Sequence, residues 1–364
     1  MRVVFAPDKF AGTLSAGEAA AAMAEGWRRR APEDDLVMVP MSDGGPGFVD
    51  VLHTATSGHL HAVTVVDPYG NDVPAVVLEH NGTAYVESAM AVGLSLTPEP
   101  DRRPEDGSSR GVGMLVDAAV DLGVSRVVVG LGGSATNDGG AGLLGALGAT
   151  CITGALDAGA TGLADVTGVD LTAALERVAG IDLVMASDVD NPLLGINGAT
   201  KIYGPQKGLR EERLVTVDAW LQELADATDR KLAAAKGAGA AGGLGYALML
   251  LGGTRRPGVE LVAEAVGLAE AVRGADLVVT GEGAFDFSSR SGKVPYGVAQ
   301  VATEHLVPCI ALAGQVLIGS REMRTLGVES AYSTVDLVGE ERSMRAPAEA
   351  LAALAERTAR TWSH

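Results

Sequence analysis

The sequence predicts an α/β fold in which a doubly wound parallel sheet is interrupted by an inserted mixed α/β domain. Short apolar strands alternate with helices at both ends of the chain, as in parallel sheets, whereas the middle carries an antiparallel hairpin signal. The length of 364 residues fits about two domains, because single domains usually have roughly 100–200 residues. We therefore expect one domain at residues 1–60 and 265–364 and a second at residues 61–264.

The amino-terminal segment has the order strand, helix, strand. Residues 2–6 form an apolar run that predicts a buried strand, and an alanine-rich helix is expected over residues 15–30. Ser15 suits the N-cap of this helix because Glu18 follows three residues later, which is the spacing of a capping box. A second strand is expected over residues 36–40, so this segment predicts parallel pairing.

The inserted region begins with three short strands, expected over residues 61–66, 73–79 and 83–87. The last two are joined by Asn81-Gly82, and an Asn-Gly pair between apolar runs is a strong signal for a two-residue hairpin loop. These strands therefore predict antiparallel pairing.

The rest of the chain returns to alternating strands and helices. Strands are expected over residues 126–129 and 181–186, and a long helix over residues 211–236. Three further strands are expected at residues 277–280, 308–313 and 329–333. Two strands at the start and three at the end make five, the number in a small doubly wound sheet, so we expect the outer domain to be flavodoxin-like.

The composition excludes several classes of protein. The 28 basic and 46 acidic residues give a net charge of −18, which argues against a general nucleic-acid binder, whose affinity comes from neutralising phosphates. The sequence has no apolar run long enough for a membrane span and no apolar core of a signal peptide near its first residues. Cys151 and Cys309 lack metal-ligand spacing and are expected to be buried thiols. We expect a soluble, cytoplasmic protein.

Glycine is unusually frequent, at 49 of 364 residues, and is densest in the run GLGGSATNDGGAG at residues 130–142, which we call the glycine loop. The loop follows an apolar strand and opens a helix. Closely approaching backbone N–H groups and the positive end of a helix dipole suit an anion or a phosphate. The alternative is a tight turn that only packs the helix on the strand. The Ser, Thr, Asn and Asp residues between the glycines favour a binding site.

Four carboxylates are expected at one edge of the outer sheet, because Asp8, Asp43, Glu282 and Asp286 each follow a predicted strand. In open α/β sheets, ligands bind beyond the carboxyl ends of the strands. A lone aspartate in such a position more often caps a helix. Four carboxylates at one edge instead favour catalysis or metal binding.

Lysine is scarce, with six residues in the chain, and three of them stand near glycine or proline in loop-like motifs: Lys9, Lys207 and Lys293. A compact ammonium group is a good partner for phosphate or carboxylate. The alternative for each is a solvated surface lysine.

Two apparent motifs fail when their surroundings are considered. Residues 237–242 match GxGxxG, but a predicted helix precedes them, so a nicotinamide cofactor is not expected. Gly292-Lys293 ends like a P-loop, yet Val294 stands where that motif needs Ser or Thr.

Six stretches of the sequence, spread over about residues 1–315, together resemble the glycerate kinase family. The resemblance implies ATP-dependent phosphorylation of glycerate to 2-phosphoglycerate. It also implies a flavodoxin-like domain interrupted by a restriction-endonuclease-like domain. The stretches are APDKFAGTLSA (6–16), PMSDGGPGF (40–48), GLGGSATNDGGAG (130–142), ASDVDNPLLGINGATKIYGPQKG (186–208), GAGAAGGLG (237–245) and LVVTGEGAFDFSSRSGKVPYGVA (277–299).

The chain departs from the family pattern at three positions. Ala11 stands where lysine is common, Pro46 where an acidic residue is common, and Ala284 where arginine is common. These changes bear on the acceptor, so a kinase of another small hydroxy acid or sugar acid stays open as an alternative. A non-catalytic protein that binds a nucleotide or a metabolite is the second alternative.

ATP and Mg²⁺ are the expected cofactors. Phosphoryl transfer depends mainly on positioning and on neutralising charge, so an acidic chain needs backbone amides, Mg²⁺ and a few lysines around the phosphates. We expect Asp188 and Asp190 to bind Mg²⁺ or to accept the proton of the acceptor hydroxyl. The other nucleotide contacts are expected from Gly132, Gly133, Ser134, Thr136, Asn137, Lys207 and Asp43, with Lys9 as an assisting catalytic cation.

Glycerate is the expected acceptor. Arg110, in the polar segment at residues 108–111, is expected to clamp its carboxylate, because the planar guanidinium matches a carboxylate with two hydrogen bonds. Asp286 and Lys293 are expected to orient the substrate, and Asp8 and Glu282 to complete its site. Nucleic acid and membrane are not expected as partners, and a homodimer is an open option for the assembly.

Overall fold

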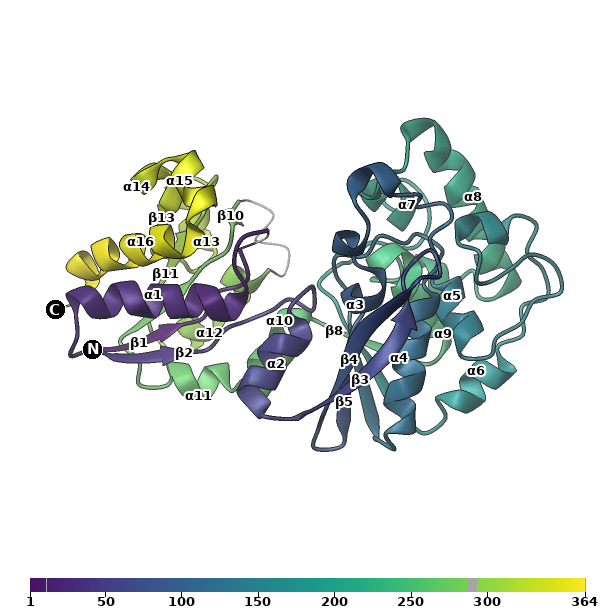
Figure 1. The fold of residues 1–364 in the computed structure, drawn as a ribbon, viewed down its shortest axis with the longest axis horizontal. Helices are drawn as coiled ribbons and strands as arrows, with labels where there is room; N and C mark the ends of the chain where they lie inside the picture. The colour runs from purple at the N-terminus through teal and green to yellow at the C-terminus, as the bar shows by residue number, and fades with distance from the viewer. Residues whose placement is uncertain (11, 287–292, 364) are drawn as a thin grey trace. The chain divides into compact units, whose positions relative to one another are not determined.

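The computed structural model describes residues 1–10, 12–286 and 293–363, and the chain forms two compact units (Figure 1). The terminal unit comprises Met1–Asp43, Asp50–Thr56 and Pro257–His364, and the inserted unit comprises Gly44–Val49 and Ser57–Arg256. Residues 44–49, 57–60 and 257–264 group differently from the expected boundaries. For residues 44–49 the reason is local, because the amides of Gly47 and Val49 donate to the Glu87 carboxylate at 3.1 and 3.2 Å.

A five-stranded parallel sheet forms the centre of the terminal unit, in the order β13-β11-β9-β1-β2. Counted along the chain and starting from the β2 edge, the order is 2-1-3-4-5, which is that of flavodoxin-like sheets. The predicted fold class is therefore confirmed. The strands of this unit are β1 (Arg2–Phe5), β2 (Asp35–Met38), β9 (Leu277–Thr280), β10 (Ala284–Phe285), β11 (Cys309–Ala313), β12 (Gln315–Val316) and β13 (Ser330–Ser333).

Two long helices, α1 and α16, lie side by side in the terminal unit (Figure 1). The predicted capping box of α1 is confirmed, because Ser15 Oγ accepts from Glu18 N at 3.2 Å and Ser15 N donates to Glu18 Oε2 at 2.8 Å. The rings of Phe5 and Trp27 meet edge to face at 5.8 Å in the core between helix and sheet. The helices are α1 (Ala16–Arg30), α2 (Phe48–Thr56), α10 (Gly258–Ala265), α11 (Leu268–Val272), α12 (Val294–Glu304), α13 (Ser320–Thr325), α14 (Thr334–Val338), α15 (Glu340–Arg345) and α16 (Pro347–Trp362).

The inserted unit contains a six-stranded mixed sheet in the order β3-β4-β5-β6-β7-β8. The first three strands pair antiparallel and the rest parallel. The Asn81-Gly82 hairpin is confirmed, and both residues have positive φ, +50° and +74°, as a type I′ turn requires. The strands are β3 (His59–Val66), β4 (Asp72–His80), β5 (Thr83–Glu87), β6 (Arg126–Gly130), β7 (Asp182–Ala186) and β8 (Thr254–Arg256).

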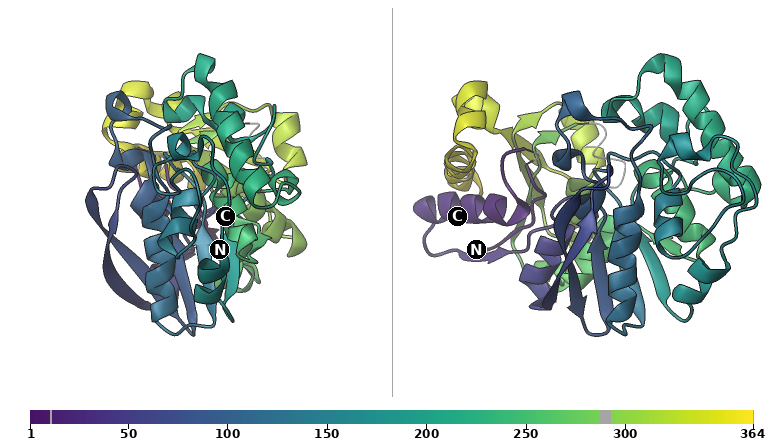
Figure 2. Two further views of the ribbon diagram at one scale, coloured as in Figure 1. Left: turned by 90° about the vertical axis from the view of Figure 1, so that its right-hand side faces the viewer. Right: turned by 45° about the vertical axis from the view of Figure 1, so that its right-hand side comes forward.

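Helix α4 runs along the strands of this sheet (Figure 2), and a large apolar core lies beneath it. The long helix predicted over residues 211–236 is wrong, because α8 ends at Ala227. Asp229 Oδ1 accepts from the amides of Lys231 and Leu232, at 2.9 and 3.0 Å, and so starts a new short turn. The helices are α3 (Ala89–Val92), α4 (Arg110–Asp121), α5 (Ala141–Ala146), α6 (Thr172–Arg177), α7 (Ala199–Tyr203), α8 (Leu214–Ala227) and α9 (Leu244–Leu250).

Both cysteines are free thiols. Cys309 is buried, which raises its pKa to about 12, whereas Cys151 is only half-buried. Across residues 1–10, 12–286 and 293–363, no helix has both the length and the apolar character that crossing a membrane requires.

Candidate functional site

The glycine loop leaves the carboxyl end of β6 with a backbone shape that its neighbours define. Gly133 has a φ of +68°, and a Cβ on it would lie 2.9 Å from Cγ of Pro46, so glycine is required there. Leu94 N donates to Gly133 O at 2.8 Å. Ala135 N donates to Val92 O at 2.7 Å. These contacts hold one side of the loop.

Five other amides in the first half of the loop have no hydrogen-bond partner in the part of the chain that the structure describes. Among the described residues, no hydrogen bond is donated by the backbone N–H of Gly132, Gly133, Ser134, Thr136 or Asn137. Two buried side-chain atoms, Thr136 Oγ1 and Asn137 Oδ1, are also unpaired. Ser134, Thr136 and Asn137 are buried, and buried polar groups are normally paired, so the unpaired donors along this loop indicate a site for an anion that accepts from them.

The amides at the amino terminus of α5, whose positive end is expected to favour an anion, already have an acceptor within the protein. The carboxylate of Asp138 accepts from two of them, with Oδ1 accepting from Gly140 N at 3.0 Å and Oδ2 accepting from Gly142 N at 3.2 Å. Ser109 donates to Asp138 Oδ2 through both its amide and its hydroxyl, each at 2.7 Å. Burial raises the pKa of Asp138, and these hydrogen bonds oppose that effect.

Lys207 lies inside the inserted unit, with 2% of its surface exposed. Its Nζ donates to Ser134 Oγ at 3.0 Å and to Thr136 O at 2.6 Å. Burial lowers the pKa of Lys207 to about 7, and the charge of Asp138 opposes this effect. Both of these hydrogen bonds therefore join the buried lysine to the glycine loop.

Asp188 and Asp190 follow the carboxyl end of β7. Asp188 is half-buried, whereas Asp190 is exposed and forms ion pairs with Arg255, at 2.7 Å, and Lys236, at 3.2 Å. Burial of Asp190 acts against ionisation, but the contacts with Lys236 and Arg255 outweigh it and lower the pKa. Asp190 therefore stays ionised over the physiological range.

The two aspartates fit Mg²⁺ only in part. Among the residues that the structure describes, no three His, Cys, Asp or Glu side chains are grouped so that they could hold a metal ion. Mg²⁺ commonly takes one or two carboxylates and completes its shell with water and phosphate oxygens. Asp188 fits that role better than Asp190, whose charge is already balanced by two cations.

The terminal unit brings six predicted residues together beyond the ends of β1, β2 and β9. Two lysines each link two carboxylates. Lys9 Nζ lies 3.8 Å from both Asp8 Oδ1 and Asp43 Oδ1. Lys293 Nζ lies 3.7 Å from Glu282 Oε2 and 3.8 Å from Asp286 Oδ1. We call this set the strand-end cluster: Asp8, Lys9, Asp43, Glu282, Asp286 and Lys293.

Asp8 is a buried acid of this cluster with a raised pKa. It is 7% exposed, and its Oδ1 accepts from the amide of Lys9 at 2.7 Å. Burial raises the pKa of Asp8 to about 7; the charge of Lys9 lowers it, and the charges of Asp43 and Glu282 raise it further. A carboxyl group with this pKa can take up and release a proton near neutral pH.

Arg110 was predicted in a short polar loop, but in the structure it is the first residue of α4. Its Nη1 forms an ion pair with Asp157 Oδ2 at 3.3 Å, and both side chains are about half exposed. The reason is that Ser109 hydrogen-bonds Asp138 and so fixes the start of the helix. Ala11 and Gly292, also singled out in the sequence, lie outside the described residues.

Several residues of the loop's surroundings were missed by sequence reasoning. Asp138 stands in the middle of the GGSATNDGG motif, and its isolation among glycines is a signal for a cap that the prediction did not use. Thr200 is another such residue, and its Oγ1 accepts a hydrogen bond from Asn137 Nδ2 at 3.0 Å. Since a hydroxyl can donate or accept, the Asn137 amide can pair with it in either orientation and present a donor or an acceptor to a ligand.

The discounted GxGxxG segment has a packing role. Gly242 has a φ of +73°, and a Cβ on it would lie 2.0 Å from Thr136 O. Gly139 N donates to Gly242 O at 3.0 Å. Gly242 and Gly243 therefore let one backbone segment lie directly on the glycine loop.

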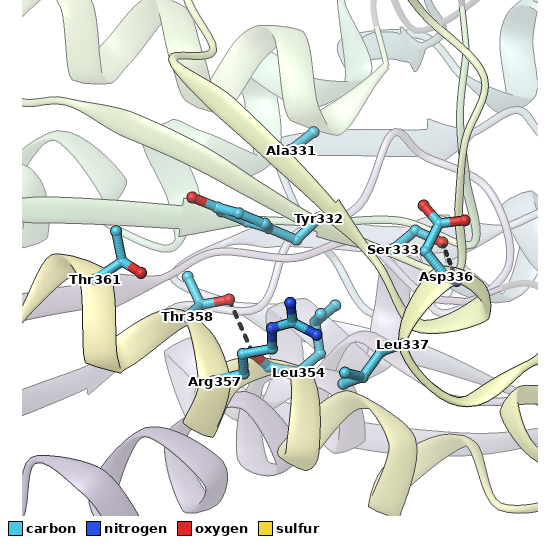
Figure 3. Close-up of a pocket in the computed structure, with 9 residues that line it drawn as sticks. All are labelled: Ala331, Tyr332, Ser333, Asp336, Leu337, Leu354, Arg357, Thr358 and Thr361. Carbon is cyan, nitrogen blue, oxygen red and sulfur yellow. Dashed lines mark hydrogen bonds between the residues drawn. The ribbon is translucent and has the colours of Figure 1, made fainter.

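A pocket of about 350 Å³ lies in the terminal unit (Figure 3). It is lined by residues of β13, α14 and α16, among them Tyr332 and Arg357. The Tyr332 hydroxyl accepts from Trp362 Nε1 at 3.0 Å. None of the site residues expected from the sequence lines this pocket.

Comparisons with known proteins agree with these motifs. The model of the glycerate kinase family matches residues 3–363. Glycerate kinase of Bacillus subtilis (strain 168) is 39% identical over 345 residues, which cover 92% of this chain and 90% of the relative. Glycerate 2-kinase of Escherichia coli (strain K12) is 39% identical over 349 residues, which cover 93% and 92%.

A solved structure has the same fold as this chain. A protein from Salmonella typhimurium LT2, provisionally assigned as glycerate kinase 2, superposes with a TM-score of 0.81 at 36% identity and covers 99% of this chain and 98% of its own. The family match spans both units and every motif described above. The chain is therefore a kinase, and it belongs to the glycerate kinase family.

Proposed function

We propose that this protein transfers the γ-phosphoryl group of ATP to the 2-hydroxyl of D-glycerate, giving 2-phosphoglycerate and ADP. The observation that carries the proposal is the glycine loop, whose five unpaired amides suit a polyphosphate. The relative from Escherichia coli is named a glycerate 2-kinase, which supports the 2-position. Cytoplasmic location and a homodimer remain predictions.

The chemistry requires little covalent help from the protein. The hydroxyl oxygen of the acceptor bonds to the γ-phosphorus, the bond from that phosphorus to the bridging oxygen of ADP breaks, and the hydroxyl proton passes to a carboxylate. We assign the phosphates to the amides of residues 132–137, because backbone donors bind an anion without adding titratable charge. Mg²⁺, when bound, neutralises charge on the phosphate oxygens, and Asp188 is its best-fitting ligand.

We assign the acceptor and its proton to the strand-end cluster. Asp8 suits the role of general base because its pKa of about 7 lies near the working pH. Lys9 and Lys293 supply positive charge for the glycerate carboxylate, with Glu282 and Asp286 orienting Lys293. Asp190 suits this role less well, because its pKa is lowered by Lys236 and Arg255 against the effect of burial.

The test couples the product to enolase. The protein is incubated with Mg-ATP, D-glycerate and enolase, without phosphoglycerate mutase. The proposal expects phosphoenolpyruvate at once, because enolase accepts 2-phosphoglycerate. A signal that appears only after mutase is added would identify 3-phosphoglycerate and overturn the regiochemistry.

A panel of acceptors distinguishes the remaining alternatives. ADP release that is faster with another hydroxy acid or sugar acid than with glycerate would correct the acceptor. No ADP release with any acid, together with thermal stabilisation by ATP, would show a binding protein without kinase activity. Reactions without acceptor measure background hydrolysis of ATP.

A further inference from the structure

Lys207 is a buried cation whose hydrogen bonds are not directed at solvent. A buried ammonium group is costly unless its donors are used. Two of its three donors bind the glycine loop, one at the Ser134 hydroxyl and one at the Thr136 carbonyl. Both acceptors belong to residues whose own amides have no partner among the described residues. The lysine therefore holds the loop at two of the residues whose amides remain available.

The loop has little freedom to move away from Lys207. The Thr136 carbonyl also lies against Gly242, where even a Cβ would come within 2.0 Å. On the same side, Gly139 N donates to Gly242 O at 3.0 Å. The carbonyl side of the loop is thus confined by packing and by hydrogen bonds.

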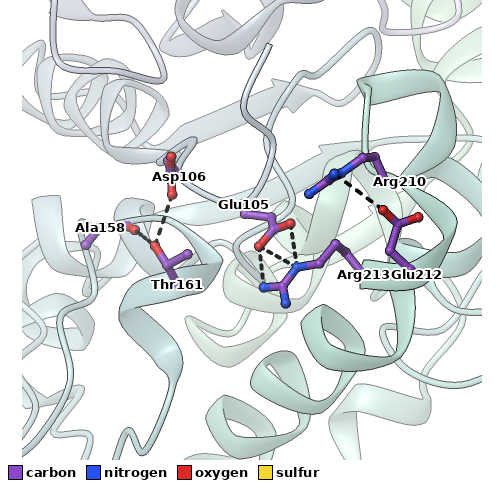
Figure 4. Close-up of polar contacts among 7 residues, drawn as sticks. All are labelled: Glu105, Asp106, Ala158, Thr161, Arg210, Glu212 and Arg213. Carbon is purple, nitrogen blue, oxygen red and sulfur yellow. Dashed lines mark hydrogen bonds and ion pairs between the residues drawn. The ribbon is translucent and has the colours of Figure 1, made fainter.

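The segment that carries Lys207 is itself anchored (Figure 4). Arg213 binds the Glu105 carboxylate with two nitrogens, Nε at 3.0 Å and Nη2 at 2.7 Å. Its guanidinium also lies 5.2 Å from the centre of the Trp220 ring. A bidentate pair of this kind fixes both distance and orientation. The ion pair ties the chain just after Lys207 to the segment around Glu105.

We infer that Lys207 is a positioning residue, which holds the glycine loop in its anion-binding shape and does not itself contact the phosphates. The inference deepens the proposed function and rests on it for the identity of the ligand. Donors that are already in place cost no rearrangement when a charged group arrives. The lowered pKa of Lys207 agrees with a side chain that acts through hydrogen bonds at a buried position.

Hydrogen exchange tests the inference without reference to activity. Lys207→Met is compared with the wild-type protein and with Lys201→Met, which removes the same charge from the same region. Lys201 is half-buried and pairs with Asp218 at 3.9 Å, so it is a matched control. Exchange of peptides covering residues 131–142 should quicken about 10- to 100-fold in Lys207→Met, the range for losing a hydrogen bond from a charged donor. Exchange at the wild-type rate would overturn the inference.

Nucleotide kinetics give a second readout. Lys207→Met should raise the KM for ATP about 10-fold and leave the KM for glycerate unchanged, because only the loop is disturbed. Lys201→Met should change neither. An unchanged KM for ATP in Lys207→Met would contradict the inference while leaving the proposed kinase activity intact.

A double-mutant cycle separates positioning from direct contact. Ser134→Ala removes one of the two acceptors of Lys207, and it serves as the test on its own if Lys207→Met does not fold. If the lysine acts through the loop, the two substitutions together should weaken ATP binding by clearly less than the product of their separate effects. Effects that multiply fully would show that Lys207 acts on the phosphates independently and would overturn the inference.

Discussion

The glycine loop of the inserted unit and the strand-end cluster of the terminal unit occupy the same kind of position, yet they have opposite chemistry. Both follow the carboxyl ends of parallel strands. The loop offers backbone amides that have no partner among the described residues, and one buried lysine binds the loop at Ser134 and Thr136. The cluster offers four carboxylates that share two lysines. The same topology thus places neutral donors in one unit and charged carboxylates in the other.

This difference bears on the proposed binding of ATP by a chain with a net charge of −18. Amide donors carry no net charge and do not titrate, so under the proposal the affinity of the loop for phosphate should change little with pH. The strand-end cluster changes its charge near neutral pH, because burial raises the pKa of Asp8 to about 7. Substitutions in the two regions should therefore differ in their dependence on pH.

The largest effect is expected for Asp8→Asn. Loss of a general base typically costs about 100- to 10,000-fold in rate, so kcat should fall within that range. The wild-type kcat should rise with pH through about 7 as Asp8 ionises, and the variant should lose this limb. Asp276→Asn is the control, because Asp276 directly precedes the amino end of β9, whereas Asp8 lies beyond the carboxyl end of β1. A wild-type limb that persists in Asp8→Asn would remove Asp8 from the base role.

Asp8→Asn should also change how the free energy of unfolding depends on pH. Because the pKa of Asp8 rises from the ordinary 3.8 to about 7, the folded state binds the proton more tightly than the unfolded chain. Wild-type stability should therefore fall between about pH 4 and 7, by on the order of 4 kcal/mol from this group. Urea unfolding at pH 5 and pH 8 should show a smaller difference for Asp8→Asn. An equal difference would mean that Asp8 ionises normally.

Gly242→Ala tests the packing on the glycine loop. The added methyl would lie 2.0 Å from Thr136 O at a φ of +73°, so we expect a loss of roughly 3 kcal/mol and about 100-fold in kcat/KM for ATP. Gly123→Ala has a similar φ of +70° but open space around it, so it should lose about 1 kcal/mol and keep its activity. Thermal unfolding and steady-state kinetics measure both. Equal losses in the two variants would show that the close approach does not matter.

Asp190→Asn should have a smaller effect, without a change in the pH profile. The carboxylate is paired with Arg255 and Lys236, and its lowered pKa keeps it ionised near neutral pH. Because such partners position neighbouring groups, we expect a loss of about 10- to 100-fold in kcat/KM at every pH tested. Disappearance of the acid limb in this variant would make Asp190 the base in place of Asp8.

The smallest effect is expected for Glu105→Gln. The bidentate pair with Arg213 is partly exposed, with 22% of the Glu105 side chain accessible, so its loss should cost about 1 kcal/mol. The KM for ATP should rise about two- to threefold, because the segment carrying Lys207 is less firmly held. Glu212→Gln is the control, since Glu212 contacts the exposed Arg210. A larger effect from Glu212→Gln would contradict the anchoring role of the Glu105–Arg213 pair.

Local patterns predicted the parts of the fold that local interactions determine. The capping box at Ser15, the Asn81-Gly82 turn and the five-strand count all rest on neighbouring residues and were confirmed. The end of α8 at Ala227 was missed, because Asp229 starts a turn that helical periodicity does not reveal. Periodicity describes which face of an element is apolar, and it carries no information on where a side chain competes for backbone amides.

The candidate site could likewise be predicted only in part from local sequence. Glycine density and strand order were enough to locate the loop and the four carboxylates. The burial of Lys207 and the occupation of the α5 amino terminus by Asp138 depend on contacts between distant segments. In the sequence, Lys207 looks like the other two lysines in loop-like motifs. Only the tertiary structure shows that Lys207 is buried and donates hydrogen bonds to Ser134 and Thr136.

The central claim, that the unpaired amides of the glycine loop bind the phosphates of ATP, is tested most directly by a crystal structure with a non-hydrolysable ATP analogue and Mg²⁺. We predict phosphate oxygens about 3 Å from the backbone nitrogens of residues 132–137, with Lys207 still bonded to Ser134 and Thr136. Phosphates bound only by Lys9 or Lys293, with the loop amides unoccupied, would contradict the account.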